Sequence, residues 1–116
     1  MSGILGLAYD SISVNKLPTF LDTASMQDKS FALYLALNPK DSFMTIPGFD
    51  KDLMKDREFK YHSVVEKKYY SLNLTNVGQR DKRIDTSGFK AVIDSGTSAI
   101  IGPADMIADF VEGISV

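Results

Sequence analysis

The sequence predicts a mostly β protein with short helices, one of them amphipathic and close to the end of the chain. Residues 31–37 and 69–74 alternate in hydrophobicity with the period of a strand that is buried on one face. A third apolar run, 89–93, also has the length of a strand. Residues 103–114 instead place apolar side chains at helical spacing. The 116 residues fit one domain, and no apolar run approaches the roughly 18 residues of a membrane span.

The first thirty residues give weaker signals. The apolar run 3–8 suits a buried strand that ends in a tight turn, although its periodicity also allows a core helix. Residues 11–20 have loop chemistry, and 19–24 favours a helical turn.

Residues 31–46 predict a β-hairpin. After the alternating run 31–37, residues 38–42 supply turn chemistry, because Pro39 fixes φ and the Asn and Asp side chains close turns. The apolar run resumes at 43–46, and the Pro-Gly pair at 47–48 ends it.

The second half alternates charged and apolar segments. Residues 50–68 mix acids and bases as a solvated surface segment does, and 76–83 predicts an exposed turn between strands. In the helix, Pro103 suits the first position, Asp105 suits the first turn, and Gly113 suits the end. The predicted apolar face consists of Met106, Ile107, Phe110, Val111 and Ile114.

Composition excludes several classes of function. The 13 basic residues are balanced by 15 acidic ones and are spread along the chain, so nucleic-acid binding has no electrostatic basis. Without cysteine, and with His62 as the single histidine, zinc sites built on sulfur or on two histidines cannot form. The acids at 50–58 lack the spacing of a calcium loop. We expect neither a metal nor another cofactor.

Two motifs carry possible chemistry. Asp94 directly follows an apolar strand and lies in a turn where Ser95, Thr97 and Ser98 offer hydroxyls and Gly96 lets a backbone amide approach closely. These groups could hold an acid at the floor of a cleft, but an ordinary turn closed by the aspartate fits them as well. Asn73-Leu74-Thr75 matches the N-glycosylation sequon, although its position in a predicted strand favours an unmodified asparagine.

The stretch 91–103 resembles the second active-site loop of the pepsin-like aspartic proteases, in which an apolar pair precedes Asp-Thr/Ser-Gly-Thr-Ser. Three further segments resemble that family in the same order along the chain. Residues 3–9 resemble the segment that closes the first lobe, and residues 31–35 with 46–50 resemble the hairpin between the lobes. Residues 69–74 resemble a strand that flanks the cleft.

This resemblance implies a partial pepsin-like aspartic protease fold, in which 1–30 is the end of the first lobe with the inter-lobe segment and 31–116 is the first half of the second lobe. It implies an aspartic endopeptidase that binds a polypeptide in a cleft, is secreted, lysosomal or vacuolar, and uses a water activated by two aspartates that share a proton. The resemblance assigns Asp94 as the second-lobe aspartate, with Gly96 as the backbone donor to its carboxylate. Ser95 belongs to the same loop, and the Thr97 hydroxyl braces that loop against a partner loop. The substrate cleft is lined by Ser98 and Val92, with Tyr69 on the primed side and Ile4 on the unprimed side.

The departures from the family pattern also matter. The chain has no second Asp-Thr/Ser-Gly, lacks the tyrosine-bearing flap and the second half of the C-terminal lobe, and has Pro47 where the hairpin motif has glycine. The first-lobe aspartate must then come from the rest of a longer chain or from another chain, and we expect the 116 residues alone to be inactive. The alternative is a non-catalytic, truncated or pseudo-protease chain that binds peptides or proteins.

Overall fold

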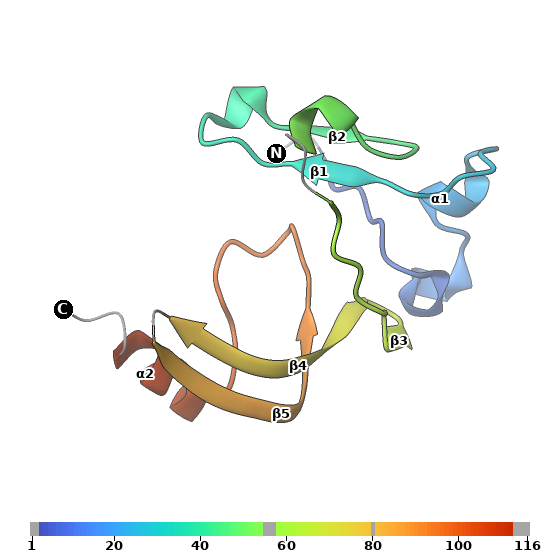
Figure 1. The fold of residues 1–116 in the computed structure, drawn as a ribbon. Helices are drawn as coiled ribbons and strands as arrows, with labels where there is room; N and C mark the ends of the chain where they lie inside the picture. The colour runs from blue at the N-terminus through green and yellow to red at the C-terminus, as the bar shows by residue number, and fades with distance from the viewer. Residues whose placement is uncertain (1–2, 55–57, 80, 113–116) are drawn as a thin grey trace. The chain divides into compact units, whose positions relative to one another are not determined.

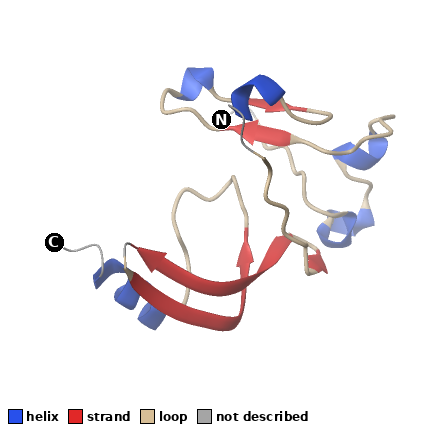
Figure 2. Ribbon diagram, in the orientation of Figure 1, coloured by secondary structure: helices blue, strands red, loops and turns tan. Residues whose placement is uncertain are grey.

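The computed structural model describes residues 3–54, 58–79 and 81–112 (Figure 1). The chain divides into two compact units, Met1–Tyr61 and His62–Val116, and each is described by itself. Strands, short helices and turns make up both units, which confirms the predicted class (Figure 2).

The apolar run at the start of the first unit is neither a strand nor a helix, so the predicted buried strand is wrong. Ile4 is 85% exposed and Leu5 is 49% exposed. An apolar run becomes a buried strand only where a neighbour pairs with it, and no strand among the described residues does so. Short 3-10 turns follow at Asp10–Ile12 and Val14–Lys16.

The predicted helical turn is present as α1, Phe20–Thr23. Its capping box is complete, because the Thr19 hydroxyl accepts the Asp22 N–H (3.3 Å) and the Asp22 carboxylate accepts the Thr19 N–H (3.1 Å). The Lys29 ammonium, 3.0 Å from Asp22, lowers the pKa of Asp22 to about 2, together with the bonds that the Thr19 hydroxyl (2.8 Å) and the Thr19 N–H donate to the same carboxylate. Leu21 is the only apolar side chain among the described residues that is buried (8% exposed).

The predicted hairpin is confirmed, with β1 (Ala32–Tyr34) antiparallel to β2 (Phe43–Thr45). The turn between them contains the 3-10 turn Pro39–Asp41, where the Asn38 side chain accepts the Lys40 N–H (3.3 Å). Tyr34 and Phe43 are directly paired, and their rings stack at 5.2 Å. Beyond β2, Gly48 has φ of 78°, which favours glycine, and a further 3-10 turn spans Lys51–Met54.

The second unit is a three-stranded antiparallel sheet in the order β3 (Glu66–Lys67), β4 (Tyr70–Gln79) and β5 (Lys82–Val92). The predicted exposed turn over 76–83 is wrong, because β4 and β5 remain paired as far as Gln79 and Lys82. Backbone pairing needs no apolar alternation, and the Val77–Ile84 pair supports this end of the hairpin. The register shifts between Leu74 and Asn76, which marks a bulge.

Helix α2, Ala104–Glu112, packs against the β4–β5 hairpin (Figure 2). It begins one residue after Pro103, whose carbonyl accepts the Ile107 N–H (3.0 Å). At its other end Glu112 pairs with Lys82 of β5 (3.2 Å). The predicted helix is therefore confirmed, while Gly113 and Ile114 lie outside the described residues. Within the described ranges no helix is long and apolar enough to cross a membrane.

Candidate active site

Asp94 stands where strand β5 gives way to a turn. The Ile93 N–H still donates to the Tyr70 carbonyl of β4 (3.0 Å), so the pairing extends one residue past the end of β5. The Asp94 carbonyl then accepts the Thr97 N–H (3.2 Å), which closes the turn. The sheet therefore fixes the backbone immediately before the carboxylate, and the turn fixes it immediately after.

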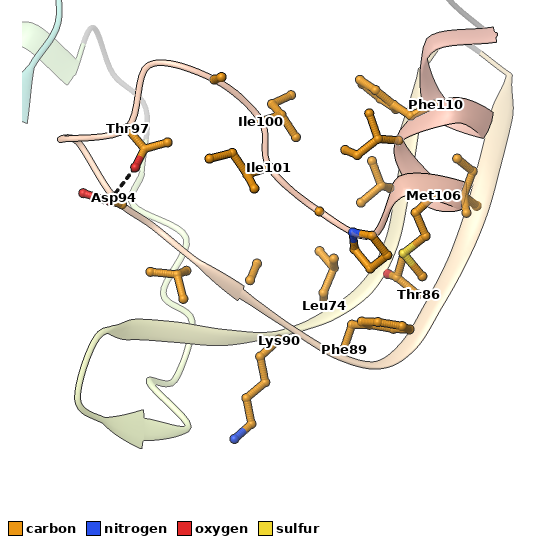
Figure 3. A pocket seen from close by; sticks show the side chains of 18 residues that line it. Leu74, Thr86, Phe89, Lys90, Asp94, Thr97, Ile100, Ile101, Met106 and Phe110 are labelled. Atoms are coloured by element: carbon orange, nitrogen blue, oxygen red, sulfur yellow. Dashed lines mark hydrogen bonds between the residues drawn. The ribbon is translucent and has the colours of Figure 1, made fainter.

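Each oxygen of the Asp94 carboxylate accepts one hydrogen bond from this turn. The Gly96 N–H donates to Oδ1 (2.9 Å), and the Thr97 hydroxyl donates to Oδ2 (2.6 Å), as Figure 3 shows for Thr97. Hydrogen bonds to the charged form favour it, so the bond from Thr97 and then the bond from Gly96 lower the pKa of Asp94. The turn thus holds an oriented, ionised carboxylate.

The position of Gly96 suits glycine for a steric reason. A Cβ on this residue would lie 3.1 Å from Asp94 Oδ1, closer than ordinary van der Waals contact. A larger residue would press on the oxygen that the Gly96 N–H holds. The predicted role of Gly96 as a backbone donor agrees with this geometry.

The proton of the Thr97 hydroxyl is donated within its own turn. The resemblance assigns this hydroxyl to a bracing contact with a partner loop, whereas in this structure it donates to Asp94. In the described part of the chain neither Ser95 nor Ser98 donates to the carboxylate, and both are exposed.

The other residues that the resemblance assigns are not part of this turn. Val92, 49% exposed, lines the same cavity as Asp94. Tyr69 is 51% exposed just before β4, and among the described residues no hydrogen bond joins it to the Asp94 carboxylate. Ile4 belongs to the first unit. The structure therefore brings together Asp94, Gly96 and Thr97, with Val92 nearby. No group of three or more potential metal-ligating side chains gathers within the described ranges.

A cavity of about 580 Å³ extends from Asp94 and Thr97 between the hairpin, the following loop and helix α2 (Figure 3). Its lining is mainly apolar and includes Leu74, Phe89, Ile100, Ile101, Met106 and Phe110. Thr86 of β5 also lines it, is 1% exposed, and has a hydroxyl without a partner among the described residues. Sequence reasoning missed Thr86 because it lies in a polar stretch without apolar alternation.

A strand here delivers an aspartate into a turn of Ser, Gly and Thr, where a backbone donor and a hydroxyl donor hold the two carboxylate oxygens. The sequence of this turn resembles the second active-site loop of the aspartic proteases. Comparison with known proteins supports this class, since the family model described as eukaryotic aspartyl protease matches residues 1–116. The chain belongs to the eukaryotic aspartyl protease family.

Individual relatives agree with this family. The chain is 32% identical to pregnancy-associated glycoprotein 2 of Sus scrofa over 112 residues, which is 91% of this chain and 26% of the relative. It is 30% identical to a vacuolar aspartic protease of Candida albicans, over 90% of this chain and 26% of the relative. It is 29% identical to cathepsin D of Homo sapiens, over 97% of this chain and 29% of the relative. The chain thus spans less than a third of the length of these relatives, and no solved structure matches it.

Proposed function

We propose that the protein acts as an aspartic endopeptidase in which Asp94 is one member of the catalytic pair. The observation that carries the proposal is the Asp94 carboxylate, held by the Gly96 N–H and the Thr97 hydroxyl at 2.9 and 2.6 Å. Membership of the aspartyl protease family supports peptidase activity in general.

The lowered pKa of Asp94 suits the basic member of the pair. An ionised carboxylate can accept a proton from a water molecule as that water attacks a peptide carbonyl. The partner acid must hold the other proton, because two adjacent carboxylates do not ionise together easily. Asp94 is the only aspartate of the sequence in an Asp-Ser/Thr-Gly motif. The partner must therefore come from the rest of a longer chain or from another chain, and the 116 residues alone are inactive.

The substrate is a polypeptide bound in an extended, largely apolar stretch. Val92 and Ser98 line the cleft beside Asp94, while Tyr69 and Ile4 contact the substrate on opposite sides of the scissile bond. In this arrangement 1–30 closes the first lobe and 31–116 begins the second. The enzyme works in a secreted, lysosomal or vacuolar setting, as the vacuolar relative does by its name.

The test compares two aspartates that are held alike. Asp85 of β5 is exposed like Asp94 and also accepts one backbone N–H and one hydroxyl, since the Ser87 N–H (2.9 Å) and the Ser87 hydroxyl (2.6 Å) both donate to its Oδ1. The size of the native enzyme is first established with an antibody against residues 50–68. In that enzyme, we expect Asp94→Asn to abolish cleavage of an apolar peptide in acidic buffer and Asp85→Asn to leave the cleavage unchanged. Retained cleavage by Asp94→Asn would overturn the assignment.

One observation favours the non-catalytic alternative. The single Asp-Ser-Gly motif lies beside an apolar cavity that could bind peptide without cleaving it. The binding function replaces the proposed one under two conditions. The native polypeptide has only 116 residues, and apolar peptides bind the Asp94→Asn variant as tightly as they bind the unaltered chain, without being cleaved by either.

A further inference from the structure

Asn73 lies on an exposed stretch of strand β4, in the sequon Asn73-Leu74-Thr75. The chain has four asparagines, and Asn73 is the only one followed at the second position by serine or threonine. Asn73 and Thr75 are exposed, whereas Leu74 lines the apolar cavity. We propose that Asn73 is an N-glycosylation site of this protein, modified by an oligosaccharide carried on a polyisoprenyl diphosphate.

Strand geometry keeps the acceptor away from the cavity. Successive side chains of a regular strand point to opposite faces, so Asn73, which precedes Leu74 on the regularly paired side of the bulge, faces away from the cavity that Leu74 lines. Figure 3 shows Leu74 among the residues of this cavity. A glycan on Asn73 therefore extends into solvent and displaces none of the apolar contacts between the hairpin and helix α2.

The surroundings of Asn73 leave room for a glycan. Strand β3 pairs with β4 only at Tyr70 and Ser71, so it ends before Asn73. The residue opposite Asn73 on β5 is Lys90, whose ammonium pairs with Glu66 at 3.3 Å. In the described part of the chain the Asn73 side chain makes no hydrogen bond, so modification of its amide breaks none there.

Thr75 lies where the strand is least regular. The register of β4 against β5 shifts between Leu74 and Asn76, so Thr75 has no direct cross-strand partner. The sequon threonine is therefore not covered by a directly paired residue of the neighbouring strand.

The chemical step is a transfer to the side-chain amide. The Asn73 Nδ2 atom attacks the anomeric carbon of the first sugar, a C–N bond forms, and the bond from that carbon to the diphosphate oxygen breaks. The amide loses one proton, and polyisoprenyl diphosphate leaves. No oxidant or reductant is needed.

The inference rests on the secreted, lysosomal or vacuolar setting of the proposed function, because a chain encounters the polyisoprenyl-linked oligosaccharide only when it enters the secretory pathway. Its test is independent of catalysis. The 116-residue chain is expressed behind a cleavable signal sequence in a eukaryotic cell. Molecules from which the signal has been removed are then purified, and their mass is measured before and after treatment with peptide N-glycosidase. Whether those molecules cleave peptides has no influence on the result.

The variants separate this sequon from other causes of a mass change. We expect glycan mass on the unaltered chain and on the control Asn76→Gln, and none on Asn73→Gln or Thr75→Ala. Thr75→Ser preserves the sequon and retains the glycan on at least part of the molecules. Tyr61→Asn, at a position that is 86% exposed and lies two residues before the exposed Ser63, creates a second acceptor and shows that the cell modifies this chain elsewhere. Processed molecules without glycan on Asn73, or glycan that persists in Asn73→Gln, would overturn the proposal.

Discussion

Thr86 offers a direct test of how the second unit is stabilised. Its side chain is 1% exposed, and its hydroxyl has no partner among the described residues. A buried hydroxyl without a hydrogen bond costs about 1–3 kcal/mol, because it loses its bonds to water and gains none. Thr86→Val replaces that hydroxyl with a methyl group of similar size and retains the branching that suits a strand. We expect Thr86→Val to raise the free energy of unfolding by about 1 kcal/mol or more.

The assay is urea unfolding of the 116-residue chain, followed by far-ultraviolet circular dichroism. The midpoint should rise while the dependence of the unfolding free energy on urea stays constant, since the surface exposed on unfolding changes little. Thr75→Val makes the same exchange at an exposed position of β4 and should alter stability by no more than about 0.5 kcal/mol. If Thr86→Val were less stable than the unaltered chain, the hydroxyl would have a partner in solution and the reasoning would fail.

Three further predictions concern the Asp94 turn, the first hairpin and the cap of helix α1. Thr97→Val should raise the pKa of Asp94 in a carbon-13 NMR titration, while Thr97→Ser should keep it lowered; an equal pKa in both variants would contradict the role of the hydroxyl. A double-mutant cycle on Tyr34→Leu and Phe43→Leu should give a coupling of about 0.5–1.5 kcal/mol, and no coupling would mean that the stacked rings do not interact in solution. Since the pKa of Asp22 falls from 3.8 to about 2 on folding, its contribution to stability is present above pH 3.8 and is lost as the pH falls through 2. Asp22→Asn should flatten the stability profile in that window, and an unchanged profile would count against the ion pair.

The sequence predicts those elements whose signals are local. The hairpin over 31–46 follows from alternation on both sides of a turn that contains Asn38 and Pro39, and the structure forms it. Helix α2 follows from apolar spacing after Pro103. In the site, the bond from the Gly96 N–H to Asp94 could be expected because a tight turn after an aspartate brings the next amides close to its carboxylate.

What the sequence does not reveal depends on neighbours. The run 3–8 has the composition of a buried strand, but burial requires a partner that composition cannot supply. The pairing of Gln79 with Lys82 joins two polar residues through their backbones and leaves no hydrophobic signal. The burial of Thr86 has the same origin, since the cavity that Thr86 lines is formed with helix α2 and the hairpin, whose positions periodicity does not connect. For Thr97, the residue type indicated a hydroxyl donor but not which acceptor it would choose.

All strand pairs in the described residues join segments that are neighbours in sequence, β1 with β2, β3 with β4, and β4 with β5. Such local contacts close short loops, which favours rapid folding. A chain growing from the ribosome can therefore form the first hairpin before the second unit has been synthesised, and can form β4 with β5 before helix α2 emerges. Until that helix arrives, the apolar face of the second hairpin is open to water and to other chains. A pause in synthesis that leaves Val92 outside the ribosome and Ala104 still inside it would prolong this exposure, whereas a pause after the helix has emerged would not.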